Sequence, residues 1–436
     1  MYIMKLRKLF YNTVLKIYNK RLSFESLYSE VLEGLEDREK RRFINLVNQF
    51  FRNFNFLEQY FIENIDKNID DQGMKISMLI LCAGTEYFYL DSSTDYSVVN
   101  DFVEIAKEEL GQGKAKYINA ILRKMTKLTL SEEDKVSKKA LYLSHPQWVI
   151  DRLIADHGKQ TAEDILKFNQ SVPSVYVRAN RIKNSRDELK VHLESEGLVS
   201  SAVEHFEDFL KVERGNVLSS RSFEEGRFYI QDPSHSLPVL ILDPKKNEKV
   251  LDLCCAPGGK STYVQELTGN KVRLHLNDIS MKKRVLIKMN FKRLGLEFNK
   301  LTFQEAQKFQ VFEEFDKILI DAPCTGSGNF RRHPESRWNK DEEMLSQLTK
   351  LQFEILTRAS IFVKIGGFIV YSTCSVFKEE NMDIINKFLE ADDHFIVETS
   401  ADTKLDIFKN VDGSYAVNPG IHHHEGAFAV RLKRVR

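Results

Sequence analysis

Hydrophobic positions in the first 130 residues recur at three- and four-residue spacing, which is the period of an amphipathic α-helix. Two series that follow this period are Leu27, Val31, Leu35 and, further on, Phe43, Leu46, Phe50. No proline occurs before Pro146, so nothing in this stretch forces a helix to stop. The pattern therefore predicts an all-α helical bundle over residues 1–130.

The pattern becomes mixed over residues 131–240. A polar run at residues 131–134 contains a helix-start signal, which places a domain boundary near residue 131. Helical spacing then surrounds residues 148–157 and 162–168, and short β-like stretches follow at residues 174–177 and 227–230. We expect residues 131–240 to form a small α/β connecting domain.

From residue 241 onward, short apolar strands alternate with helices. The strand-like stretches are residues 250–253, 272–276, 317–320 and 368–371, and helical stretches cover residues 280–294 and 341–362. This alternation is typical of a parallel sheet with helices on both faces. Residues 241–436 are therefore predicted to form a Rossmann-like α/β domain.

Charge and cysteine content narrow the class of protein. The formal net charge is only +1, so any contact with nucleic acid must come from a local basic patch. One candidate precedes Glu25 and consists of Lys5, Arg7, Lys8, Lys16, Lys20 and Arg21, although a solvated helix face explains these residues equally well. Five cysteines and no long apolar run argue against a disulfide framework and against a membrane span. We expect a soluble, cytoplasmic monomer.

A turn rich in small residues follows the strand at residues 250–253. It reads Cys254, Cys255, Ala256, Pro257, Gly258, Gly259, Lys260 and runs into a helix. Small residues at the carboxyl end of a strand let the backbone approach a ligand closely. A phosphate-binding P-loop would need Gly at position 254, and the dinucleotide pattern G-x-G-x-x-G is also missing.

The third cofactor class for such a turn is S-adenosylmethionine. It needs an acidic residue at the end of the second strand to hold the ribose hydroxyls. Asp278 follows the strand-like residues 272–276 and meets that need, although an N-cap of the next helix would explain it too. Strand, turn and acid together favour adenosylmethionine.

Two further cysteines lie at strand ends. Asp321, Ala322, Pro323 and Cys324 end one strand, and Ser372, Thr373 and Cys374 end the next. Strand ends form the ligand edge of an open α/β sheet, where a thiolate would be accessible, whereas Cys82 fits a core position. A thiolate that adds to C6 of cytosine turns C5 into a nucleophile for a methyl group. Asp321 could hold the pyrimidine edge, and a base must finally remove the C5 proton.

Metal chemistry fits the sequence poorly. Zinc deaminases use H-x-E and P-C-x-x-C, and although His205 and Glu207 match the first pattern, position 327 is Ser instead of the second Cys. The consecutive histidines His422, His423 and His424 lack a regular partner spacing and are more typical of a loop. We therefore expect no metal.

At these residues the sequence resembles the RNA cytosine-C5 methyltransferase family of the RsmB/Sun (Fmu)/NSUN type. The similarity covers the cofactor turn at residues 254–260, the two cysteine motifs, residues 331–335 with Trp338, and residues 229–234 before the catalytic domain. Residues 116–125 resemble the last helix of a NusB-like domain, which points to the bacterial RsmB subgroup.

The resemblance implies a class I methyltransferase fold, in which a seven-stranded mostly parallel sheet follows a NusB-like RNA-binding domain (residues 1–130) and the connecting domain. It also implies that Cys374 is the nucleophile, that Cys324 aids breakdown of the adduct, and that Asp321 contacts the target base or the methionine end of the cofactor. Lys260 helps to bind target or cofactor. Glu305 replaces the family's Asp near the adenine, Cys255 replaces an Ala, and residues 425–428 depart from the family's final-strand pattern.

The implied substrate is small-subunit ribosomal RNA. Two alternatives stay open: a transfer-RNA methyltransferase with the same chemistry, and a catalytically idle RNA-binding assembly factor. An idle factor would be expected to have lost some of the residues that catalysis needs, yet Asp278, Asp321, Cys324 and Cys374 are all present.

Overall fold

The computed structural model describes residues 2–90 and 95–436, and its contacts divide the chain into two compact units. The first, called the helical unit below, comprises Met1–Ser171 and Phe330–Asp341. The second, called the sheet unit, comprises Val172–Asn329 and Glu342–Arg436. Contacts thus group residues 131–171 with the bundle, and the division at residues 130 and 240 stays a prediction.

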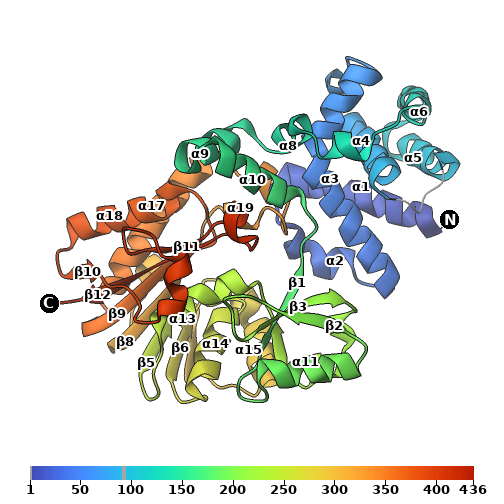
Figure 1. Cartoon of the computed structure of the whole chain (residues 1–436). Helices are drawn as coiled ribbons and strands as arrows, with labels where there is room; N and C mark the ends of the chain where they lie inside the picture. Colours follow the sequence, from blue (N-terminus) through green and yellow to red (C-terminus); the bar gives the residue numbers. More distant parts are fainter. Residues whose placement is uncertain (1, 91–94) are drawn as a thin grey trace. The chain divides into compact units, whose positions relative to one another are not determined.

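The helical unit is built on five long helices (Figure 1): α1 (Tyr2–Lys20), α3 (Asp37–Asn64), α4 (Met74–Tyr89), α5 (Asp95–Leu110) and α6 (Gln112–Met125). Aromatic side chains fill its core, among them Phe10, Phe50 and Phe61, which are fully buried. Shorter helices complete it: α2 (Tyr28–Val31), α7 (Glu132–Lys135), α8 (Lys138–Leu143), α9 (Gln147–His157) and α10 (Lys159–Gln170). The predicted all-α bundle is confirmed.

Most of the basic residues on α1 and just after it are paired with acids. The Arg7 guanidinium is buried and contacts both Glu86 (2.8 Å) and Asp101 (2.5 Å). Lys16 lies 2.5 Å from Glu30, and further pairs join Lys8 to Glu108 and Glu109, and Arg21 to Asp341. These four residues are therefore paired with acids in this structure, and an RNA contact by this basic run stays a prediction.

Residues 330–341, called the crossover segment below, belong to the helical unit although both flanking stretches belong to the sheet unit. Within the segment, the fully buried Arg337 in α16 (Ser336–Asn339) donates to the carbonyl oxygens of Asn169 (2.6 Å) and Ser144 (3.1 Å). The Arg331 guanidinium is also buried and lies 4.5 Å from the ring centroid of Phe168. In this structure the Arg331 guanidinium is therefore engaged in the interior of the helical unit.

The sheet unit begins with a four-stranded antiparallel sheet of order β2-β3-β1-β4. Its strands are β1 (Val175–Ala179), β2 (Val199–Ala202), β3 (Phe209–Arg214) and β4 (Phe228–Ile230). Two helices, α11 (Arg186–Ser195) and α12 (Arg221–Glu224), accompany it. The β-like stretches predicted at residues 174–177 and 227–230 correspond to β1 and β4.

An eight-stranded sheet forms the rest of the sheet unit, with the order β10-β12-β9-β8-β5-β6-β7, and β11 pairs with β12 outside this order. Strands β5 to β9 are parallel, while β10, β11 and β12 join antiparallel. The strands are β5 (Lys249–Asp252), β6 (Arg273–Asn277), β7 (Lys300–Thr302), β8 (Phe315–Asp321), β9 (Val363–Thr373), β10 (Phe395–Val397), β11 (Tyr415–Val417) and β12 (Ala427–Arg434). The predicted seven-stranded, mostly parallel sheet is confirmed, with β11 as an addition.

Helices cover both faces of this sheet (Figure 1). Val250 packs with side chains of α14 (Gly259–Thr268) and α15 (Arg284–Leu294), whereas its neighbour Leu251 packs with α17 (Glu342–Ser360) and α18 (Met382–Ala391). Alternate residues of a strand face opposite sides, so a strand buried on both faces must be apolar throughout. Two short helices, α13 (Leu237–Leu242) and α19 (Pro419–His422), complete the unit.

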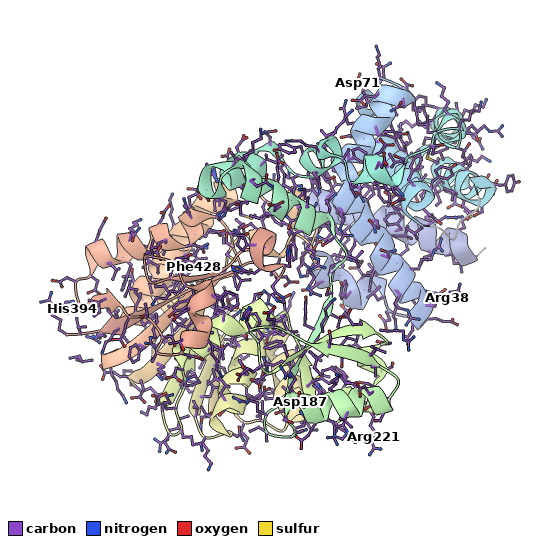
Figure 2. The ribbon with its side chains drawn as sticks, in the orientation of Figure 1. Arg38, Asp71, Asp187, Arg221, His394 and Phe428 are labelled. Carbon is purple, nitrogen blue, oxygen red and sulfur yellow. The ribbon has the colours of Figure 1, made fainter. Side chains whose placement is uncertain are left out.

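The last strand packs normally despite its departure from the family pattern. Figure 2 labels Phe428, which lies in β12, is buried and pairs in register with Thr373 of β9. Within residues 2–90 and 95–436, none of the helices is both long and apolar enough to cross a membrane.

Candidate active site

The predicted cofactor turn joins the end of β5 to the start of α14, and two glycines make it possible. Gly258 has a φ of 101°, a conformation that side chains with a Cβ rarely adopt. A Cβ on Gly259 would lie 2.9 Å from the Tyr229 ring. The turn can therefore follow its tight path only with glycine at these positions.

Asp278 lies directly after β6 and ties that strand end to the cofactor turn. Its Oδ2 accepts from the backbone N–H of Ala256 (3.0 Å), and its Oδ1 accepts from the N–H of Ser280 (2.8 Å). Ser280, rather than Asp278, occupies the N-cap position of the next helical turn. The N-cap alternative for Asp278 is therefore wrong, and each carboxylate oxygen keeps a lone pair for a ligand hydroxyl.

Asp252, the last residue of β5, is a site residue that the sequence reasoning missed. Its Oδ2 accepts from the Ser261 hydroxyl (2.5 Å), while its Oδ1 is buried and has no hydrogen-bond partner among the residues that the structure describes. Burial raises the pKa of this carboxyl from 3.8 to about 7, and the negative charge of Asp321 adds to the rise. Its place at a strand end beside the cofactor turn is the signal that could have identified it.

The other predicted cofactor residues lie around the same turn. The Cys255 side chain is buried, and its N–H donates to the Asn277 carbonyl (2.9 Å). Burial raises the pKa of both Cys254 and Cys255, so both stay protonated thiols. Glu305 is a partly exposed carboxylate whose Oε2 lies 2.8 Å from Lys308 Nζ. Its contact with adenine stays a prediction.

Cys324 and Cys374 come together at the carboxyl ends of β8 and β9, with their Sγ atoms 3.3 Å apart and no disulfide between them. The hydrogen bond to Cys374 raises the pKa of Cys324 well above its usual range, and burial and the charge of Cys374 raise it further. Cys324 is thus the protonated partner, and its S–H can donate to the Cys374 sulfur.

Lys260 and Asp321 form an ion pair beside this cysteine pair, with Nζ and Oδ2 2.6 Å apart. Burial opposes the charge of Lys260, but Asp321 and then Cys374 raise its pKa above the usual value. The ammonium therefore keeps its charge beside the cysteine pair.

Hydrogen bonds from buried polar groups hold the two loops that carry Cys324 and Cys374. Glu380 accepts from the Thr325 N–H (2.8 Å), the Thr325 hydroxyl (2.5 Å) and the Gln352 amide (3.0 Å). The N–H of Gly328 donates to the Cys374 carbonyl (2.9 Å). Nothing in the local sequence marks Glu380 as part of the site, since its partners lie 28 and 55 residues away.

Arg178, on β1 of the four-stranded sheet, holds the start of α14. Its guanidinium is fully buried, forms two hydrogen bonds with the Glu266 carboxylate (3.0 and 2.9 Å) and donates to the Gly259 carbonyl (2.9 Å). It also lies over the ring of Tyr263, 4.5 Å from the centroid. Arg178 is a positioning residue for the cofactor turn that the sequence pattern did not reveal.

The residues considered for metal binding do not gather into a site. The Nδ1 of His422 accepts from the Asn418 N–H (2.8 Å), and its ring packs against Phe408. Among the described residues, three potential ligand groups come together only at Asp392, Asp393 and His394. His394 is exposed and is labelled in Figure 2.

Three family models match successive parts of this chain. The model described as "16S rRNA methyltransferase RsmB/F" matches residues 239–433, the ferredoxin-like domain model of RsmF/B-like methyltransferases matches residues 145–218, and the NusB family model matches residues 4–127. The match at residues 239–433 includes the cofactor turn and both cysteine loops.

Proteins from bacteria are similar to this chain in sequence. The probable ribosomal RNA small subunit methyltransferase B of Bacillus subtilis (strain 168) is 34% identical over 324 residues, which cover 73% of this chain and 72% of that protein. Ribosomal RNA small subunit methyltransferase B of Shewanella oneidensis is 28% identical over 98% of this chain and 99% of its own length.

Solved structures share the fold. A methyltransferase homolog protein from Pyrococcus horikoshii aligns with a TM-score of 0.57 and 25% identity, covering 70% of this chain and 98% of its own. NSun6 from the same organism, crystallised with SFG, aligns with a TM-score of 0.61 and 20% identity over 67% of this chain and 98% of its own.

Proposed function

Because the chain belongs to the RsmB/F family of 16S rRNA methyltransferases, we propose that it forms 5-methylcytosine in small-subunit ribosomal RNA through a covalent bond between Cys374 Sγ and cytosine C6. The observation that carries this proposal is the cysteine pair, whose sulfur atoms lie 3.3 Å apart at the ligand edge of the sheet. The pKa of Cys324 is raised well above its usual range, so this thiol holds its proton. A pair made of one nucleophile and one proton-holding thiol fits covalent catalysis on a pyrimidine.

S-adenosylmethionine is the methyl donor of this family, and when bound it supplies an electrophilic methyl group. The residues present fit it. Asp278 offers carboxylate lone pairs for the ribose hydroxyls, and the glycines at 258 and 259 keep the turn open to close approach. The partnerless Oδ1 of Asp252 suits a donor such as the α-ammonium group of the cofactor.

In the proposed reaction the Cys374 thiolate adds to C6, and the electron pair of the C5–C6 double bond moves onto C5. The nucleophilic C5 then accepts the methyl group. Lys260 favours the thiolate before attack, and Asp321, which Lys260 holds at 2.6 Å, faces the incoming base as a hydrogen-bond acceptor for its amino group.

Release of the product requires loss of the C5 proton. Once Cys374 is bonded to C6, its hydrogen bond and its charge no longer raise the pKa of Cys324, and only burial and the charge of Glu380 still do so. The pKa of Cys324 then falls, so Cys324 loses its own proton to solvent more readily. The resulting thiolate takes the C5 proton, and the C–H electron pair restores the double bond as Cys374 departs. The adduct itself therefore switches Cys324 into its role.

The nucleophile is tested by Cys374→Ser. This variant should transfer no tritiated methyl group to a transcript of small-subunit ribosomal RNA, because a serine hydroxyl is far less ionised than a thiol at neutral pH. Retention of activity would overturn the assignment of Cys374. Substitution of the buried Cys82, which lies in the helical unit, is the matched control and should leave transfer intact.

The release role is tested by Cys324→Ser. Adduct formation needs only Cys374, so with RNA and cofactor this variant should accumulate a covalent protein–RNA species, visible as a slowly migrating band on a denaturing gel. Absence of that band would count against the role of Cys324, and the double variant with Cys374→Ser should abolish it. Bisulfite sequencing of RNA from cells lacking the protein would identify the modified cytosines.

The same mapping separates the alternatives. Loss of 5-methylcytosine from transfer RNA instead of ribosomal RNA would indicate a transfer-RNA enzyme with the same chemistry. Unchanged methylation in both RNAs would indicate the idle assembly factor.

A further inference from the structure

The surface formed by Ile279 and the 3₁₀ turn and helix at residues 281–294, called the α15 surface below, combines two unusual features. It is strongly basic, since no acidic residue occurs between Asp278 and Glu297 while six cations do: Lys282, Lys283, Arg284, Lys288, Lys292, Arg293. It also exposes a row of large apolar side chains. Neither feature is used by the site described above.

The basic side chains of this surface are not neutralised. Arg293 points inward and donates to the carbonyl oxygens of Phe223 (2.9 Å) and Phe228 (3.0 Å). The other five cations are exposed, and none of them forms an ion pair with any residue in the described part of the chain. They contrast with the amino-terminal helix, where acids pair with Arg7, Lys8 and Lys16.

The apolar side chains form a row on the outward side of the helix. Ile287, Phe291 and Leu294 are buried and hold the helix on the sheet unit. On the other side Met281, Val285 and Met289 follow one another at four-residue spacing, with exposures of 64%, 65% and 62%, and Ile279 and Leu286 extend the row. An amphipathic helix should be polar on its outward face, and exposed apolar patches of this kind mark interaction sites.

The α15 surface is joined to the cofactor turn. It begins one residue after Asp278, whose Oδ1 accepts from the Ser280 N–H. The Asn290 amide donates to the Pro257 carbonyl within the turn (3.1 Å), and α14 and α15 pack together (Figure 1). A chain bound along α15 would thus lead to the edge of the sheet where the two cysteines lie.

We propose that the α15 surface binds single-stranded RNA next to the target cytosine, with its lysines on phosphates and its methionine–valine row against unstacked bases. This inference rests on the proposed function. RNA suits both features at once, because its phosphates match unpaired cations and its unpaired bases expose flat apolar faces. Methionine adapts its shape to such faces, which allows contact with more than one base type.

The charge contribution is tested with the triple variant Lys282→Gln, Lys288→Gln, Lys292→Gln, whose positions flank the apolar row. Binding to an in vitro transcript of small-subunit ribosomal RNA should weaken at least about tenfold, and the slope of log affinity against log salt should fall by about two to three. The matched control replaces Lys190, Lys211 and Lys245, which are exposed or partly exposed and are paired with acids, and it should bind like the wild type.

The apolar contribution is tested with Met281→Gln, Val285→Gln, Met289→Gln. This variant should also bind RNA more weakly but keep the wild-type salt slope, because no cation is lost. Both triple variants should bind adenosylmethionine with the wild-type Kd and should raise the KM for RNA without lowering kcat at saturation. A fold defect would instead weaken cofactor binding. In that case the single variants Lys288→Gln and Met289→Gln replace the triple variants in the same measurements.

The proposal would be overturned if the lysine triple variant bound RNA with the affinity and salt slope of the wild type. It would also be overturned if the lysine triple variant and the control variant lost the same amount of RNA affinity. Binding of the wild type to vesicles of phosphatidylcholine and phosphatidylglycerol, lost in the lysine variant while RNA binding is kept, would assign the surface to a membrane and would also overturn it. Failure of the proposed function has a different result: the wild type would transfer no methyl group to RNA, whatever the variants bind.

Discussion

Replacement of Arg178 by Met should damage the sheet unit more than any exposed substitution, and the damage should centre on the cofactor turn. Met matches much of the volume of the arginine stem but removes every donor. Two consequences follow. The Glu266 carboxylate loses its two hydrogen bonds in a fully buried place, and the Gly259 carbonyl loses one of its two side-chain donors, at 2.9 Å, and keeps only the Thr262 hydroxyl at 3.0 Å.

The expected magnitude comes from the burial of both partners. Removal of one member of a fully buried ion pair typically costs about 3–5 kcal/mol, because the remaining charge is left without compensation. For a unit of this size that loss lowers the melting temperature by about 10 °C. Burial already raises the pKa of Glu266, and loss of Arg178 would raise it further, so the damage should be smaller in acid, where the carboxyl is protonated.

The assay is a double-mutant cycle with Arg178→Met, Glu266→Gln and their combination. Urea unfolding followed by circular dichroism gives the stability of each, and calorimetric titration gives the Kd for adenosylmethionine. We expect the double variant to be more stable than Arg178→Met, because the uncompensated charge is gone. It should still bind the cofactor weakly, because the hydrogen bond from Arg178 to the Gly259 carbonyl is still missing. The reasoning would be refuted if the free energy of unfolding of Arg178→Met lay within about 1 kcal/mol of the wild-type value and its cofactor affinity were unchanged.

Two further predictions concern single side chains. Asp252→Asn should flatten the pH dependence of the free energy of unfolding. The raised pKa of Asp252 contributes stability that is complete below about pH 4 and is lost as the pH rises toward 7. This change amounts to about 4 kcal/mol, and asparagine, which does not titrate, cannot show it. Unfolding curves that stay parallel across this range would contradict it. Trp338→Ala should destabilise the helical unit by about 3 kcal/mol, since the indole packs on Phe54 at 5.3 Å and donates to the Phe51 carbonyl at 2.7 Å. The remaining tryptophan, Trp148, belongs to the same unit and reports its unfolding by fluorescence, and unchanged stability would show that these contacts add little.

The sequence predicted those parts of the molecule that depend on local pattern. Continuous apolar runs located β5 and β8, because a strand covered on both faces has no polar side. Residue type at the strand ends then placed Asp278, Cys324 and Cys374 at one edge, where the structure brings the two sulfur atoms into contact.

Features that depend on distant partners could not be predicted in this way. Glu380 and Arg178 are charged residues in buried places, and their partners lie up to 55 and 88 residues away. The basic residues of α1 suggested a free charged surface, and the sequence could not correct this because it does not reveal that Glu86 lies beside Arg7. The affiliation of the crossover segment with the helical unit also depends on contacts made across more than 150 residues.

The crossover segment has a consequence for how this protein is made. A ribosome at residue 171 has synthesised almost the whole helical unit, but Phe330 follows 159 residues later. At usual rates of synthesis this delay is on the order of ten seconds or more. During this time the nascent chain lacks Arg337, which donates to the carbonyl groups of Ser144 and Asn169, and Trp338, which packs on Phe54. The part of the chain that emerges first is therefore completed late, and a gene fragment ending at residue 171 would encode a bundle that lacks a piece of its own interior.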